Sequence, residues 1–155
     1  MAVSGRTSIP RLSRRTIVRE RLLSRLHAGI GNGVTVLEAP AGYGKTTLLA
    51  QFVGDVDYAC KWLSLDSTSG SPEILAHQLG VALTGNLDIE PPATAAKVSD
   101  LQAYVGAVMS QALGDSDRPV LLVIDNTHEL AENREAANLL GWLIVFLPEG
   151  NEVVL

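Results

Sequence analysis

The chain has 155 residues, of which 46% are hydrophobic and 19% charged, and its formal net charge at pH 7 is −5. This length suits one domain with a substantial core, and no apolar run approaches the ~20 residues that a membrane-spanning helix needs. The single cysteine, Cys60, excludes an internal disulfide, and the N-terminus lacks the apolar stretch of a secretion signal, so we expect a cytoplasmic protein.

Residues 1–33 are predicted to form a basic arm and an entry helix, ahead of a core at residues 34–155. Residues 1–27 contain seven arginines and one acidic residue, a balance of +6, whereas residues 28–155 carry a balance of −11. Arginines spread in this way usually cover a solvated helix face or contact a phosphate, and no nucleic-acid recognition motif accompanies them. We therefore do not expect the arm itself to bind DNA.

Strands and helices alternate along the chain. Short apolar runs rich in β-branched residues predict strands, and apolar residues at helical spacing, bounded by caps and glycines, predict helices. The expected strands are residues 34–38, 58–66, 119–125 and 152–155; the expected helices are 16–27, 45–53, one opened by Ser71 and Pro72, one capped by Ser99 with Gln102, and 133–147, with a loop at 86–96. This order predicts an α/β fold with a parallel sheet.

A glycine-rich segment, EAPAGYGKTTLLAQF at residues 38–52, joins the first expected strand to the helix after it. Its spacing is that of a phosphate-binding loop, with Ala39 in the first glycine position. Gly42 and Gly44 allow the backbone N–H groups to turn inward as an anion nest, and Lys45 is expected to reach the β- and γ-phosphates of a nucleotide. The predicted binding residues are Ala39, Pro40, Ala41, Gly42, Tyr43, Gly44, Lys45, Thr46 and Thr47, the last near the α-phosphate.

An acid ends the most apolar expected strand, since Asp125 closes the run PVLLVID. Such an aspartate often only forms a turn, but a phosphate-binding loop upstream favours a role in holding Mg²⁺ through water. The hydroxyl of Thr46 would complete the metal site, so the predicted metal residues are Thr46 and Asp125.

Four segments, VRERLLSRL, VTVLEAPAGYGKTTLLAQF, KWLSLD and VLLVIDNTHEL, together resemble a known family. Their order and spacing are similar to those of the N-terminal ATPase domain of large ATP-binding LuxR-type transcriptional regulators. These regulators are similar to the maltose-regulon activator and belong to the STAND class of signalling NTPases. The resemblance covers nearly the whole chain from Ile9 on.

The resemblance implies a three-layer P-loop NTPase fold, truncated after the fourth core strand, that acts as an ATP/ADP-dependent switch. It implies that the Asp125 strand lies beside the fourth strand and the loop strand. By position it places Arg19 and Arg21 near the adenine or the phosphates, although both could equally be solvated helix arginines. The implied partners are an adenine nucleotide and the remaining domains of a longer regulator, with DNA reached only through a domain absent here and no membrane.

The chain departs from the family pattern in two ways. Asn126 stands where the family usually has a second acid, and the chain ends at Leu155 before the residues that sense the γ-phosphate. The candidate catalytic residues are Lys45, Asp125 and His128, where His128 either senses the γ-phosphate and orients water or packs beside the strand end. We therefore expect ATP binding with slow or absent hydrolysis, and suspect a fragment of a longer protein.

Two other functions stay open. One is a conventional P-loop ATPase or small-molecule kinase, and the other is an interaction module with a vestigial loop. His27, His77 and Cys60 have no metal-ligand spacing, so no zinc site is expected, whereas Trp62 and Leu65 alternate as core residues do. An unpaired EVVL segment at residues 152–155 would make the sheet edge prone to association.

Overall fold

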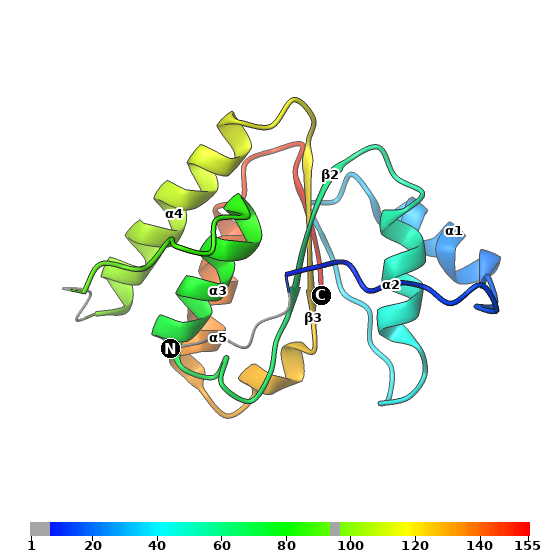
Figure 1. Cartoon of the computed structure of the whole chain (residues 1–155), viewed down its shortest axis with the longest axis horizontal. Coiled ribbons are helices and arrows are strands. Elements are labelled where there is room, and N and C mark those ends of the chain that lie inside the picture. The colour runs from blue at the N-terminus through cyan, green and yellow to red at the C-terminus, as the bar shows by residue number, and fades with distance from the viewer. Residues whose placement is uncertain (1–6, 94–96) are drawn as a thin grey trace.

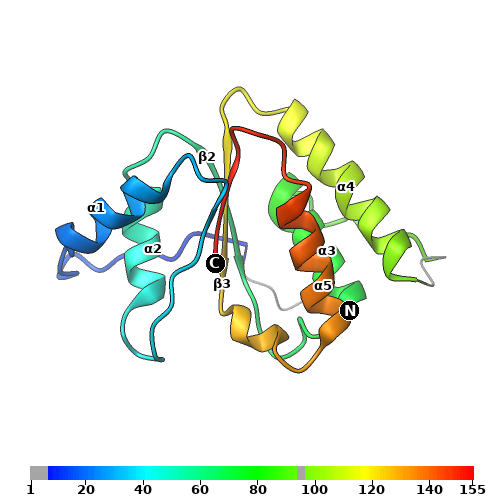
Figure 2. The ribbon, with the colours of Figure 1, turned by 180° about the vertical axis from the view of Figure 1, so that it is seen from behind.

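The computed structural model describes residues 7–93 and 97–155, which form a parallel sheet between two layers of helices. Helices α1 and α2 cover one face of the sheet, and α3, α4 and α5 cover the other (Figures 1 and 2). This is the three-layer α/β fold of a P-loop NTPase, as predicted. The elements are α1 Glu20–Gly29, β1 Val34–Thr35, α2 Lys45–Val53, β2 Ala59–Ser64, α3 Pro72–Thr84, α4 Val98–Gly114, β3 Val120–Asp125, the 3₁₀ helix η1 Thr127–Leu130, α5 Arg134–Val145 and β4 Glu152–Val154.

The strand order is β1-β4-β3-β2, and every pairing is parallel. Val153 pairs with Val34 on one side and Leu122 on the other, so β4 separates the loop strand from the Asp125 strand. The expectation that the Asp125 strand lies beside the fourth strand is confirmed, whereas its expected contact with the loop strand is wrong. The EVVL segment is paired on both sides, because β4 is a central strand.

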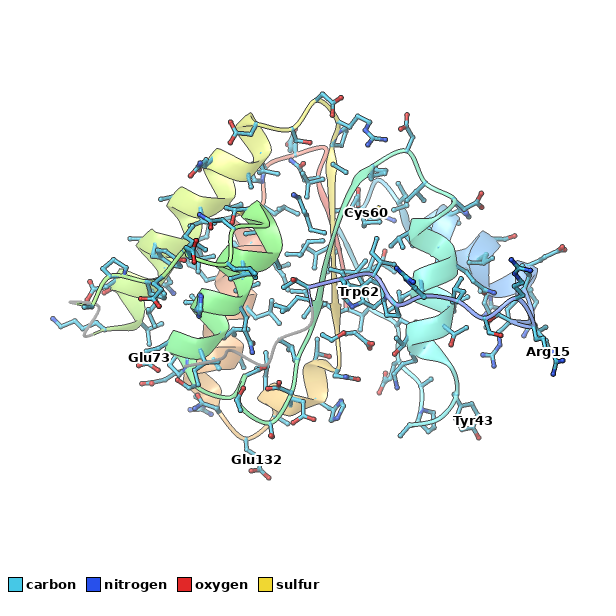
Figure 3. The ribbon with its side chains drawn as sticks, viewed as in Figure 1. Arg15, Tyr43, Cys60, Trp62, Glu73 and Glu132 are labelled. Carbon is cyan, nitrogen blue, oxygen red and sulfur yellow. The ribbon has the colours of Figure 1, made fainter. Side chains whose placement is uncertain are left out.

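The sheet separates two apolar cores, and β3 contributes to both. Leu121 and Val123 pack with residues of α1 and α2, whereas Leu122 and Ile124 pack with residues of α3, α4 and α5. All six residues of β3 are buried, as an unbroken apolar run predicts for a central parallel strand. Trp62 of β2 is buried as expected and belongs to the core under α2 (Figure 3).

Helix α1 begins at Glu20, four residues later than predicted. Arg19 is the N-cap residue, and its carbonyl accepts the N–H groups of Leu22 and Leu23. The apolar pattern failed at Ile17, whose side chain is exposed and faces no core. No described helix is both long and apolar enough to cross a membrane.

The start of α4 also differs from the prediction. The helix begins at Val98, so Ser99 lies inside its first turn and the N-cap is Lys97. The carboxylate of Asp100 accepts the Lys97 N–H at 3.2 Å, the contact that the sequence assigned to Gln102. Of the expected loop at 86–96, residues 94–96 lie outside the described part of the chain.

Other element ends shift by small amounts. β1 closes at Thr35 and not at residue 38, although the Leu37 N–H still donates to the carbonyl of Leu155 and prolongs the parallel pairing. Pro72 opens α3 as predicted, and the side chain of Asn133 caps α5 by accepting the Ala136 N–H. The parallel strands therefore all end at one edge of the sheet, where the loop after β1 meets Asp125.

Candidate phosphate-binding site

The loop after β1 has the backbone of an anion nest. Gly42 and Gly44 have φ values of 82° and 76°, in the left-handed region that glycine adopts without a Cβ clash. Gly44 is the N-cap residue of α2, so the loop runs directly into the positive end of that helix. In the described part of the chain, the N–H groups of Gly42, Gly44 and Lys45 donate to no other residue. These donors suit a phosphate group.

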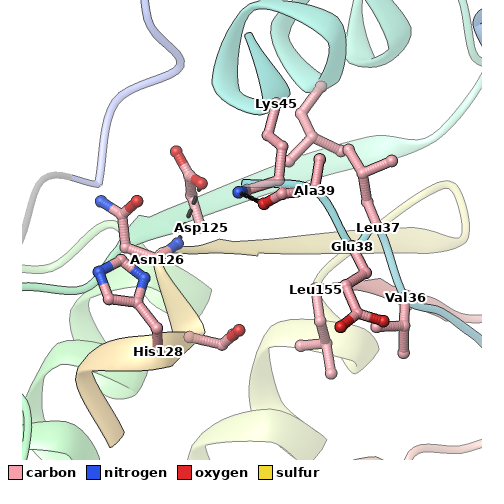
Figure 4. A pocket seen from close by; sticks show the side chains of 11 residues that line it. Val36, Leu37, Glu38, Ala39, Lys45, Asp125, Asn126, His128 and Leu155 are labelled. Atoms are coloured by element: carbon pink, nitrogen blue, oxygen red, sulfur yellow. Dashed lines mark hydrogen bonds between the residues drawn. The ribbon is translucent and has the colours of Figure 1, made fainter. Parts of the chain in front are cut away.

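Lys45 points back across the mouth of this loop. Its Nζ donates to the carbonyl of Ala39 (Figure 4). It also donates to the carbonyl of Pro40 at 3.3 Å. The ammonium lies between two adjoining cavities of about 490 and 360 Å³, both of which it lines together with His128. A polyphosphate in these cavities would offer the ammonium stronger charged acceptors than the carbonyls it now uses.

Thr46 and Asp125 meet beside the loop. The Thr46 hydroxyl donates to Oδ2 of Asp125 at 2.5 Å, and Oδ1 accepts the Asn126 N–H at 2.9 Å. Asp125 is 4% exposed, and these two donors satisfy its buried carboxylate oxygens. A hydroxyl and a carboxylate are the hard oxygen ligands that Mg²⁺ takes alongside water and phosphate, so the two residues fit the predicted metal.

A tight turn follows Asp125. Asn126 has φ 64° and ψ 37°, a left-handed conformation that asparagine tolerates better than most residues. The chain then enters η1, which carries His128 to the side of the cavity that faces Lys45 (Figure 4). The His128 side chain is 74% exposed, with Nε2 3.5 Å from a carboxylate oxygen of Glu129. His128 therefore lines the cavity with a largely exposed side chain.

The two arginines of the entry segment differ. Arg19 Nη1 donates to the Tyr43 carbonyl at 2.7 Å, so Arg19 holds the phosphate loop. Arg21 is exposed and makes no hydrogen bond or ion pair among the described residues. Tyr43 lies at the tip of the loop with an exposed ring (Figure 3). Thr47 is exposed on the first turn of α2 and does not line the cavities at the loop.

The sequence analysis missed a third cavity, of about 480 Å³, on the other side of Thr46 and Asp125. Asp66 lines it just beyond β2, and its Oδ1 accepts the Thr68 N–H and hydroxyl at 2.9 and 2.6 Å. The sequence did contain a signal for Asp66, because the expected strand at residues 58–66 ends in an acid, as the strand at 119–125 does. Ser8 also lines this cavity, and no sequence signal identified it.

Comparisons with known proteins agree with this geometry. A β-strand, a glycine loop with Lys45 and Thr46, and an acid at a neighbouring strand end together define a P-loop NTPase. Residues 29–152 match the family described as AAA domain, and the chain belongs to that family.

The chain is also similar to transcriptional regulators, as its motifs predicted. It is 35% identical over 135 residues to the HTH-type transcriptional regulator MalT of Serratia proteamaculans (strain 568). It is 34% identical over 134 residues to MalT of Yersinia enterocolitica serotype O:8, and 35% identical over 134 residues to MalT of Yersinia pestis (strain Pestoides F). Each alignment covers 83% of this chain but 14% of the relative, so the chain spans a small part of the length of these regulators.

Proposed function

We propose that this chain is the adenine-nucleotide switch of a transcriptional regulator, which binds ATP or ADP with Mg²⁺ and hydrolyses ATP slowly or not at all. The observation that carries the proposal is the convergence of unpaired loop N–H groups, the Lys45 ammonium and the Thr46–Asp125 pair on adjoining cavities. The similarity to MalT proteins, which are named as transcriptional regulators, supports the regulatory part of the proposal.

Each group has a separate task in binding. The loop N–H groups and the positive end of α2 hold the phosphate oxygens, and Lys45 moves from the Ala39 carbonyl to the β- and γ-phosphates. Thr46 and Asp125 would hold Mg²⁺, which when bound neutralises charge on the phosphates. Arg19 keeps the loop in shape through the Tyr43 carbonyl.

The same site explains why hydrolysis should be slow. An attacking water needs a group that orients it and accepts its proton, and Asn126 can orient water but cannot take its proton at neutral pH. Nucleotide exchange, and not turnover, would then set the state of the switch.

A conventional ATPase is the second candidate, and His128 is the observation that favours it. Its exposed imidazole lines the same cavities as Lys45, so a neutral ring could accept a proton from water at the γ-phosphate. The rate of phosphate release separates this candidate from the switch.

Binding is tested by isothermal titration of the parent and Lys45→Ala with Mg-ATP and Mg-ADP. Loss of a charge-assisted contact of roughly 1.5–3 kcal/mol predicts binding weaker by about 10- to 150-fold, without a change in thermal stability. Lys97→Ala removes an exposed lysine that lines neither cavity, and it is the matched control. Equal affinity of the parent and Lys45→Ala would refute the proposal.

A further inference from the structure

A further cavity, of about 480 Å³, lies at the opposite edge of the sheet, where the parallel strands begin. Its walls are the glycine turn ahead of β1, Tyr58 just before β2, and the segment that joins α5 to β4. This cavity shares no lining residue with the two cavities at the phosphate loop, so the two sites are separate.

Glu152 places a buried carboxylate in this cavity. The residue is 3% exposed, and its Oε1 accepts the Gly31 N–H at 2.8 Å. Its Oε2 is buried and has no hydrogen-bond partner among the described residues. A second hydrogen bond, from the Val153 N–H to the Gly33 carbonyl, fixes the glycine turn against β4. One carboxylate oxygen is therefore held in place while the other is unused, which is costly for a buried charge.

Among the described residues, no basic side chain lines the cavity to balance this charge. Glu149 adds a second, exposed carboxylate at the rim. Burial raises the pKa of the Tyr58 hydroxyl, and the negative charge of Glu152 raises it further, which indicates that the two side chains are close. Ile144 and Leu147 supply apolar surface beside these polar groups.

We propose that this cavity binds an organic cation, an ammonium or guanidinium group on a short apolar stem, whose charge pairs with the carboxylate of Glu152. The apolar lining suits the stem, and the face of Tyr58 adds a favourable surface for a cation. A metal ion fits less well, because no three His, Cys, Asp or Glu side chains in residues 7–93 and 97–155 cluster to hold one. The cation could come from a free small amine or from an arginine or lysine side chain of another polypeptide segment.

The test is a titration of the ¹⁵N-labelled 155-residue chain with butylguanidinium, followed through the amide signal of Gly31. We expect a saturable shift of this signal, and no shift with butylurea, which has nearly the same shape without the charge. Glu152→Gln keeps an oxygen for the Gly31 N–H but removes the charge, so binding should weaken at least tenfold. Glu149→Gln, the matched control at the rim, should change the affinity less than threefold.

Two further ligands separate the possible sources of the cation. Tighter binding of agmatine than of an arginine blocked at both termini indicates a free amine, whereas equal or weaker binding of agmatine indicates a side chain. The proposal is overturned if butylurea binds as well as butylguanidinium, if Glu152→Gln binds as tightly as the parent, or if no saturable shift occurs up to about 10 mM. The comparison of butylguanidinium with butylurea uses the parent alone and decides the question even if Glu152→Gln does not fold.

Discussion

The hydroxyl of Thr46 donates to the carboxylate of Asp125 at 2.5 Å, although the two residues are 79 positions apart in the chain. Thr46 lies in the first turn of α2 and Asp125 ends β3, and β4 separates β3 from the strand that leads into the loop. The phosphate loop and Asp125 are therefore held together by β4, which lies between β1 and β3 in the sheet but follows both of them in the sequence.

This contact predicts a specific effect on metal dependence. In Thr46→Ala, Asp125 loses its hydroxyl partner and the metal loses one oxygen ligand, so ATP binding should lose most of its dependence on Mg²⁺. A hydrogen bond to a charged group contributes roughly 1.5–3 kcal/mol, so the variant should also unfold at lower urea concentration. Titrations with Mg²⁺ and with EDTA check the first effect, with the exposed Thr47→Ala as control. A Mg²⁺ dependence in Thr46→Ala equal to that of the parent would contradict the prediction.

Arg19 and Arg21 form a second matched pair. Arg19→Ala frees the Tyr43 carbonyl and loosens the phosphate loop, so nucleotide affinity should fall by about three- to tenfold, in keeping with one exposed hydrogen bond of roughly 0.5–1.5 kcal/mol. Arg21→Ala removes the same charge from the same helix region without touching the loop. Isothermal titration measures both variants. If both lose affinity equally, general electrostatic attraction explains the effect and the loop contact does not.

The fold could be predicted from the sequence because its strong signals are local. The apolar run before Asp125, the glycine loop before Lys45 and the proline at the start of α3 each determine an element by themselves. The strand order was predicted wrongly at β4, because local patterns do not say which two buried parallel strands adjoin.

The pairing of Thr46 with Asp125 was easier to predict than the residues that surround it. The Thr46–Asp125 contact follows from the motif, whereas the place of Asp66 and Ser8 in the same cavity depends on how β2 and the N-terminal segment pack. The exposure of Ile17 has a similar cause: its spacing fits a helix, but no neighbouring element covers it.

The packing of α3 against α4 provides a test of the core. A Cβ added at Gly80 would lie 2.5 Å from the Tyr104 hydroxyl oxygen and 3.3 Å from its Cζ, and this hydroxyl has no partner among the described residues. Gly80→Ala should therefore destabilise the parent by roughly 1–3 kcal/mol through overpacking.

Gly80→Ala should no longer lower the free energy of unfolding once the Tyr104 hydroxyl is removed. In the Tyr104→Phe background the nearest contact becomes the ring carbon, and the gain in helix propensity of up to about 1 kcal/mol should make Gly80→Ala neutral or stabilising. Urea unfolding of the parent, both single variants and the double variant measures the coupling. Equal destabilisation in the two backgrounds would show that the hydroxyl is not the obstacle.

ATP hydrolysis should be slow because of the residue at position 126, which is Asn126. This residue follows Asp125 in a left-handed turn, and its side-chain amide cannot accept a proton from water at neutral pH. Loss of a general base typically lowers a rate by a factor of about 10²–10⁴, so single-turnover phosphate release by the parent should be far slower than an ordinary enzyme rate of about 1 s⁻¹.

The variants Asn126→Asp and His128→Ala show which residue is responsible for any remaining phosphate release. Asn126→Asp restores a carboxylate at the turn and should raise phosphate release, with little change in ATP affinity because the loop and Asp125 still bind the nucleotide. His128→Ala should abolish whatever release remains if the exposed imidazole takes the proton, and should leave it unchanged if it does not. Lys45→Ala, which loses the nucleotide, corrects for contaminating activity. If the parent releases phosphate at about 1 s⁻¹ or faster and Lys45→Ala abolishes this, the chain is a conventional ATPase and the switch without turnover is wrong.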